Sequence, residues 1–269
     1  PPGADVVLED DVRPSVNAVS GYFPAATFDQ DQRRNFEKAL KSLSRQLPMQ
    51  QRIFYRSLDE EDWAESWKAF FWPEKVSARI VVKPTWRDYH PSGDELVLEI
   101  DPGMAFGTGT HPTTSLSMQL LEKHLRPADR LLDIGTGSGI LMVAASLLGA
   151  AAVHGIDNDP VAVYVAQQNL VLNAIPADCS KAWTGDLVGG VTARYDCVVA
   201  NILAPVILGL LPDVRGVLAP EGRFICSGIL ESQQAEVVEK AQTLGFHLIE
   251  AVDREEWVAL AMAPGAANG

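Results

Sequence analysis

Two kinds of apolar pattern alternate along the chain from about residue 131 onward. Short continuous apolar runs read RLLDIG, VHGID, DCVVANIL and GRFICSGIL. Between and after them, helices are expected in the Ala/Leu-rich segment after RLLDIG and at about 160–173, 205–218 and 231–244. Strands that are apolar on both faces are typical of a parallel sheet that helices cover on both sides. The pattern therefore predicts an α/β fold.

The last two apolar runs are FHLIEAVDRE and EWVALAMA. They follow each other too closely for a parallel return, which needs a crossover connection of a dozen or more residues. We therefore predict a closing hairpin that adds one antiparallel strand to the sheet.

The first 57 residues carry a different pattern. Short strand candidates surround one amphipathic helix, in which Phe36, Leu40, Leu43 and Leu47 are spaced by four, three and four residues. This indicates a small α+β domain at 1–57, separate from the part that begins at about residue 79.

Residues 58–78 are expected to form a linker helix between the 1–57 domain and a second domain at 79–269. Trp63, Trp67 and Phe70 fall on one face of this helix. The stripe fits a helix that packs against a domain, and the alternative is an aromatic clamp for a partner.

Composition limits the classes of partner. The 269 residues are 47% hydrophobic and 21% charged, with a net charge of −13 and a pI near 4.8. Such a field repels phosphate backbones and attracts cations, so we expect no direct DNA binding and favour a basic protein as partner. The alternative is that surface acid only keeps the protein soluble.

The sequence also bears on compartment and membrane. Cys197 and Cys226 lie in apolar strand-like runs, and the three cysteines have no metal-binding spacing, so we expect reduced thiols and no metal site. Residues 134–156 contain no Lys, Arg, Asp or Glu. Their glycines break the run into strand, helix and strand, so we expect no membrane span and a cytoplasmic protein.

The segment DIGTGSGILMVAASLLGAAAVHGID, from Asp133 to Asp157, carries the candidate chemistry. Gly135, Gly137 and Gly139 remove side chains where a strand passes into a helix, so a ligand can approach the backbone. Asp157 follows Gly135 by 22 residues, about the interval of one crossover, and can bind ribose hydroxyls.

The third glycine distinguishes between cofactors. A dinucleotide fingerprint needs glycine at 140, which is isoleucine here, and no GK[ST] phosphate loop is present. The G-x-G-x-G form suits S-adenosylmethionine, which carries a sulfonium and no pyrophosphate. The alternative is a turn and helix that bind no ligand.

A pliable segment, LEIDPGMAFGTGTHPTT, precedes this motif and ends at Thr114. We expect it to fold over a bound ligand, with Phe106 stacking on a flat or sulfonium-bearing group and Thr113 or Thr114 bonding the methionine end. Alternatively the threonines only cap the helix that starts at Pro112, and His111 is a surface loop residue with at most a weak role as a proton relay.

Two polar residues follow later strands. Asp186, after the expected third strand, is placed to accept from an adenine amino group or is an ordinary turn acid. Asn201 ends DCVVAN, where ligands bind in open parallel sheets. We favour a role for its amide in accepting an amine N–H and orienting the nitrogen, over a purely structural one.

DPGMAFGTGTHPTT, LDIGTGSGIL, GIDNDP, VVANILA and DWAESWK together resemble PrmA, the bacterial family of methyltransferases of large-subunit ribosomal protein eleven, over nearly the whole chain. The resemblance implies a Rossmann-like class I S-adenosylmethionine-dependent methyltransferase behind a substrate-recognition domain. It implies methylation of lysine side chains and the N-terminal α-amine of a basic ribosomal protein. Its cofactor positions fall on Thr114, Gly135, Asp157 and Asn201.

Further expectations stand beside this resemblance. The N-terminal domain should be a partial ferredoxin-like unit without the opening strand and helix, and the protein should be a monomer. Asn201 is the expected catalytic residue, and no side chain stands out as a general base. The alternatives are a lysine methyltransferase with another protein target and a non-catalytic module that binds S-adenosylmethionine. A planar amide or adenine substrate is disfavoured because no aromatic follows Asn201.

Overall fold

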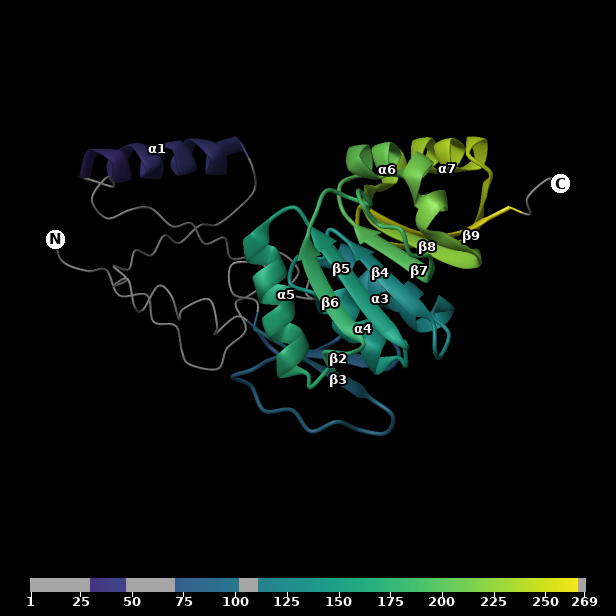
Figure 1. Ribbon diagram of the computed structural model, residues 1–269. Coiled ribbons are helices and arrows are strands. Elements are labelled where there is room, and N and C mark those ends of the chain that lie inside the picture. The colour runs from purple at the N-terminus through teal and green to yellow at the C-terminus, as the bar shows by residue number, and fades with distance from the viewer. Residues whose placement is uncertain (1–29, 47–70, 102–110, 266–269) are drawn as a thin grey trace. The chain divides into compact units, whose positions relative to one another are not determined.

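The computed structural model describes residues 30–46, 71–101 and 111–265 (Figure 1). The chain forms two compact units, Pro1–Phe71 and Trp72–Gly269. The first contains α1 (Gln30–Gln46), which includes the expected amphipathic positions from Phe36 to Leu43. The aromatic stripe expected at 63–70 lies outside the described residues.

A seven-stranded sheet forms the centre of the second unit, in the order β6-β5-β4-β7-β8-β10-β9. Five neighbouring strands are parallel: β4 (Arg130–Ile134), β5 (Ala152–Asp157), β6 (Ser180–Thr184), β7 (Tyr195–Asn201) and β8 (Leu218–Leu230). The predicted parallel sheet is therefore confirmed.

The closing hairpin is also confirmed. β9 (Phe246–Arg254) and β10 (Trp257–Pro264) pair antiparallel, and β10 inserts between β8 and β9. Glu255 lies in the tight turn with a φ of 57°. The hairpin brings Trp257, at the start of β10, beside Leu230 at the end of β8.

Helices cover both faces of the sheet, as Figure 1 shows. α6 (Ala204–Val217) and α7 (Gln234–Thr243), which follows the short 3-10 turn η2 (Glu231–Gln233), pack on one face. α3 (Pro112–His124), α4 (Ile140–Leu147) and α5 (Pro160–Leu172) pack on the other. The helices expected at 160–173, 205–218 and 231–244 are therefore present.

A second, three-stranded sheet contributes to the same core as α3, α4 and α5. It consists of β1 (Glu74–Lys75), β2 (Ile80–Pro84) and β3 (Leu96–Ile100), with β2 and β3 parallel. Since β1 lies within the 58–78 segment, the helix expected there does not extend to its last residues, as Pro73 would interrupt it.

The uncharged run 134–156 is explained by this arrangement. α4 lies in the core between the large sheet and the small one, and its residues from Ile140 to Ala145 are buried. A helix that is apolar all round is a buried helix. No helix in the described part of the chain is long and apolar enough to cross a membrane.

The cysteines also lie as expected. Cys197 and Cys226 are fully buried free thiols in β7 and β8, and burial raises the pKa of both thiols. They are therefore unreactive core residues. Cys179 is a free thiol at a partly exposed position.

Candidate functional site

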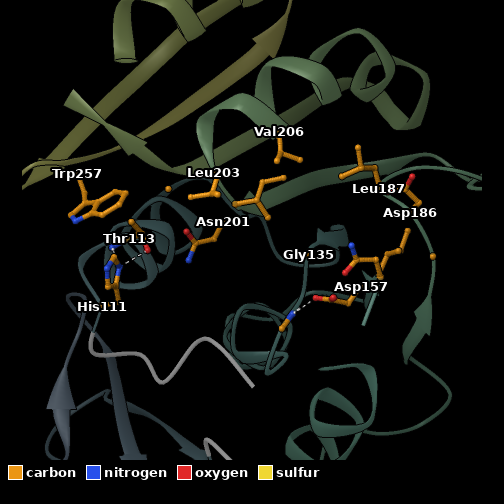
Figure 2. A pocket seen from close by; sticks show the side chains of 16 residues that line it. His111, Thr113, Gly135, Asp157, Asp186, Leu187, Asn201, Leu203, Val206 and Trp257 are labelled. Atoms are coloured by element: carbon orange, nitrogen blue, oxygen red, sulfur yellow. Dashed lines mark hydrogen bonds between the residues drawn. The ribbon is translucent and has the colours of Figure 1, made fainter. Parts of the chain in front are cut away.

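A pocket of about 590 Å³ opens at the edge of the large sheet where the parallel strands end (Figure 2). Residues at the carboxyl ends of β4, β5, β6 and β7, or just after them, reach it, among them Gly135, Asp157, Asp186 and Asn201. Ligands of open α/β sheets bind at the carboxyl ends of the strands. Residues separated by 66 positions in the sequence thus share one cavity because their strands are parallel neighbours.

The glycine-rich turn links β4 to α4 and takes a backbone that favours glycine. The φ values of Gly135, Gly137 and Gly139 are 72°, 53° and 75°. Gly135 and Gly137 line the pocket, so a ligand there meets bare backbone. A Cβ on Gly135 would lie 2.5 Å from Ile202 Cγ2, which also borders the pocket.

Gly139 has a different reason to be glycine. It is the N-cap of α4 and is not among the residues that line the pocket. A Cβ there would lie 2.9 Å from both Cα and Cβ of Ala166 on α5. The third glycine of the motif therefore permits close packing of α4 and its turn against α5.

A hydrogen bond between Asp133 and Thr136 connects the end of β4 to the glycine-rich turn. The buried carboxyl group of Asp133 accepts a hydrogen bond from Thr136 Oγ1 (2.7 Å) through Oδ2, and its Oδ1 has no partner within the described residues. Burial raises the pKa of Asp133 to about 7, and the nearby charge of Asp157 acts in the same direction. This group is therefore much less acidic than an exposed aspartate.

Asp157 ends β5 and faces the pocket. Its Oδ2 accepts from the Gly137 N–H (2.8 Å) and its Oδ1 from the Asp159 N–H (3.0 Å), so the carboxylate is held by the turns on either side. Each carboxylate oxygen has a further lone pair with which to accept from a ligand hydroxyl.

Asp186 lies in the turn after β6, on the same side of the pocket as Asp157 (Figure 2). The Asp186 carbonyl accepts from the Gly189 N–H (2.8 Å), which closes the turn, and the side chain is exposed. The next residue, Leu187, has a φ of 49°, an uncommon conformation for leucine.

Asn201 ends β7 near the middle of the pocket wall. Its Nδ2 donates to Thr114 Oγ1 over 3.3 Å. Thr114 is fully buried in the first turn of α3 and does not line the pocket, so it reaches the site only through this amide. The contact fixes which way the amide of Asn201 faces.

His111 and Trp257 close the end of the pocket beyond Asn201 (Figure 2). His111 is the N-cap of α3: its Nδ1 accepts from the Thr113 N–H (3.3 Å) and lies 2.8 Å from Thr113 Oγ1. Its ring meets Trp257 edge-on, with centroids 5.1 Å apart. The alternative that the threonines cap α3 is therefore wrong, because the histidine does so.

Apolar side chains form the wall opposite the glycine-rich turn. Ile202, Leu203 and Val206 follow Asn201 into α6, and Leu187 continues this wall toward Asp186 (Figure 2). Leu203 is 66% exposed and Val206 40% exposed, unusually open for large apolar side chains. Exposed apolar side chains around a pocket are typical of interaction sites.

Of the residues predicted for the site, the structure brings these to the pocket: His111, Thr113, Gly135, Gly137, Asp157, Asp186 and Asn201. Thr114 lies behind it, and Gly139 faces α5. Phe106 lies outside the described residues.

Several residues that line the pocket could not be foreseen from a local sequence signal, namely Leu187, Leu203, Val206 and Trp257. Gly228 also lines the pocket, and the Ser-Gly dipeptide at 227–228 is a local turn signal that could have found it. The φ of Gly228 is 86°, and a Cβ there would overlap the Ile202 carbonyl.

The residues fit S-adenosylmethionine better than a phosphate-bearing cofactor. Two aspartates and no lysine or arginine occur among the described residues around the pocket. A pyrophosphate would lack a cationic partner there, whereas a sulfonium with ribose hydroxyls meets carboxylates and bare backbone. In the described ranges, no three His, Cys, Asp or Glu side chains are placed to hold a metal ion.

The fold and this pocket define a Rossmann-like methyltransferase whose cofactor is S-adenosylmethionine. The family model of ribosomal protein L11 methyltransferase (PrmA) matches residues 5–264. The chain belongs to this family of protein methyltransferases.

Individual relatives agree with this assignment. The chain is 45% identical to the ribosomal protein L11 methyltransferase of Desulfosudis oleivorans over 261 residues, which cover 95% of this chain and 86% of that protein. It is 43% identical to that of Exiguobacterium sp. over 92% of this chain and 79% of the relative. The crystal structure of ribosomal protein L11 methylase from Lactobacillus delbrueckii subsp. bulgaricus superposes with a TM-score of 0.68 at 32% identity. That match covers 72% of this chain and 98% of the other.

Proposed function

We propose that the protein methylates ribosomal protein L11 on lysine side chains and on the N-terminal α-amine. The observation that carries this proposal is the position of Asn201, a neutral amide at the carboxyl end of β7 inside the pocket. Relatives that carry the name ribosomal protein L11 methyltransferase support the choice of substrate. The net charge of −13 favours a basic protein partner.

We assign the cofactor to the part of the pocket between the glycine-rich turn and Asp157. Gly135 and Gly137 would let the ligand lie against the backbone, Asp157 would accept from the ribose hydroxyls, and Asp186 would accept from the adenine amino group. When bound, S-adenosylmethionine supplies a methyl group on a sulfonium, which a neutral amine can attack. Phe106 remains a candidate for stacking on this ligand.

The substrate amine is assigned to the space beside Asn201. Because Asn201 Nδ2 donates to Thr114, the amide oxygen is the atom left to accept an N–H from the amine. This bond aims the nitrogen lone pair, and such positioning supplies much of the catalysis in a transfer between two bound groups.

The apolar wall has a part in making the amine reactive. A lysine ammonium has a reference pKa of about 10.4, and burial lowers the pKa of an amine because it disfavours the charged form. Ile202, Leu203 and Val206 would surround the aliphatic part of the substrate side chain and exclude water. The ammonium group would lose its proton to water before the methyl transfer. We place the reaction in the cytoplasm.

The test is methyl transfer from radiolabelled S-adenosylmethionine to purified ribosomal protein L11, with mass mapping of the products. We expect label on lysines and on the N-terminal α-amine, and its loss with Asn201→Ala. Transfer only to other basic proteins would support a lysine methyltransferase with a different target. No transfer despite cofactor binding would overturn the proposal.

A further inference from the structure

Asn169, on α5, joins two segments that are far apart in the sequence. The residue is buried, with 2% of its surface exposed. Its Nδ2 donates to the Ser138 carbonyl over 2.8 Å, and its Oδ1 accepts from the Asp101 N–H over 3.2 Å. One amide therefore bridges the glycine-rich turn and the residue that follows β3.

The Ser138 carbonyl belongs to the middle of the glycine-rich turn. Gly137 on one side lines the pocket, and Gly139 on the other packs against Ala166, one turn before Asn169 on the same helix. The Gly139 N–H is already bonded to the Thr136 carbonyl (2.8 Å). With both ends of the 138–139 peptide bonded, this peptide plane, next to Gly137, is restrained against rotation.

Asn173 provides an internal comparison one turn further along α5. Its Oδ1 accepts from the Glu99 N–H (2.8 Å), and its Nδ2 donates to the Glu99 carbonyl (2.7 Å). Like Asn169, it ties β3 to α5. Unlike Asn169, it has no hydrogen bond to the glycine-rich turn.

We propose that Asn169 is a positioning residue for cofactor binding: it holds the glycine-rich turn in its binding conformation and ties this turn to the end of β3. The role rests on the proposed assignment of the turn to S-adenosylmethionine. An isolated turn with three left-handed glycines has many accessible conformations, and a fixed partner for its carbonyl reduces the ordering required when the ligand binds.

The experiment compares Asn169→Leu with Asn173→Leu by calorimetric titration with S-adenosylmethionine and by urea unfolding. Leucine is close to asparagine in size and removes the side-chain hydrogen bonds, which number two at Asn169 and three at Asn173, whose Nδ2 also donates to the Asn169 carbonyl (2.8 Å). We expect Asn169→Leu to raise the Kd for S-adenosylmethionine by about tenfold or more, since a buried carbonyl loses its donor. Asn173→Leu should lose stability while its Kd stays within about twofold of the wild type.

Asn169→Asp removes one of the two hydrogen bonds of the residue and keeps the other. It replaces Asn169→Leu as the test if that variant does not fold. It keeps an acceptor for Asp101 but replaces the donor to Ser138 with oxygen. We expect weakened cofactor binding with unchanged hydrogen exchange at the Asp101 amide. Asn169 variants that bind as tightly as the wild type, or equal weakening by Asn173→Leu, would overturn the inference.

A further variant distinguishes failure of the inference from failure of the site assignment. Asp157→Ala alters the pocket directly. If Asp157→Ala weakens binding and the Asn169 variants do not, the role of Asn169 is wrong and the cofactor site stands. If Asp157→Ala also leaves binding unchanged, the assignment of the cofactor site fails, and the inference fails with it.

Discussion

The carboxylate of Asp157 accepts a hydrogen bond from the backbone N–H of Gly137 over 2.8 Å. The end of β5 and the turn after β4 thus fix each other before any ligand enters. The same carboxylate is placed to receive ribose hydroxyls. Preorganisation of this kind lowers the ordering cost of binding.

Asp157→Ala should therefore weaken S-adenosylmethionine binding by about 10- to 100-fold, since hydrogen bonds to a charged group contribute roughly 1.5–3 kcal/mol. Calorimetric titration measures this, and circular dichroism should show an intact fold. Asp159→Ala is the matched control: Asp159 caps α5 by accepting from Val161 N–H (2.8 Å) and does not line the pocket. It should cost about 1 kcal/mol of stability with affinity retained. Equal affinity in wild type and Asp157→Ala would contradict the ribose assignment.

Asn201→Ala should lower kcat by about 100-fold, in the range of a lost catalytic hydrogen bond, with a smaller effect on the Kd of the cofactor. Thr114→Val should lower kcat less, because the amide remains but loses the oxygen that orients it. The double variant should be no slower than Asn201→Ala, as expected for residues that act as one unit. Additive effects in steady-state kinetics would show that Thr114 acts independently.

Leu203→Ser should raise KM for the protein substrate by roughly fivefold, the cost of losing about 1 kcal/mol of apolar contact. Serine is a good N-cap, and Leu203 is the N-cap of α6, so the helix should not be weakened. The control is Val171→Ser, because Val171 is 74% exposed on α5 and does not line the pocket. A KM that does not change with Leu203→Ser would remove this wall from the substrate site.

The buried carboxyl of Asp133 should make stability depend on pH. Burial raises its pKa to about 7, while the unfolded chain titrates near 4. Between these values the unfolded state releases a proton that the folded state retains, so stability falls as pH rises. The difference of about three units between the two pKa values corresponds to about 4 kcal/mol of unfolding free energy, which is fully lost above pH 7.

Asp133→Asn removes this titration. Urea unfolding of both proteins is measured from pH 4 to pH 8 without cofactor. As pH rises, the free energy of unfolding of Asp133→Asn should increase relative to that of the wild type. Titrating groups that do not interact with Asp133 are shared and cancel in the difference. Parallel curves would mean that Asp133 is ionised in the folded protein.

Gly139→Ala should destabilise the protein by about 2–4 kcal/mol, because a left-handed backbone and a clash with α5 add together. Gly190→Ala isolates the first effect: its φ is 77°, close to the 75° of Gly139, but its Cβ position is open. It should cost about 1 kcal/mol. Equal losses for the two variants in urea unfolding would show that Ala166 yields to the added methyl group.

Much of the site could be predicted from sequence because the strands are parallel. When Asp157, Asp186 and Asn201 each end a strand or follow one directly, parallel pairing brings them to one edge without further information. The spacing of glycines and acid within one βαβ unit is equally local, since a crossover helix has a limited range of lengths.

The rest depended on contacts that no local pattern encodes. Gly139 looked like a ligand-contacting residue, and only the approach of α5 shows that it is glycine because of Ala166. Trp257 reaches His111 because the closing hairpin inserts β10 beside β8. Both pairs join residues whose separation in the sequence says nothing about their distance in space.

The apolar strands, the covering helices, the glycine-rich turn and the acids at strand ends are all encoded locally, because periodicity and short spacing act within one element or one crossover. The folded chain was needed to show which glycine packs against a helix, which residue caps α3 and which apolar side chains line the pocket. Those outcomes follow from how separate faces meet, and each face is compatible with many partners until the whole core is packed.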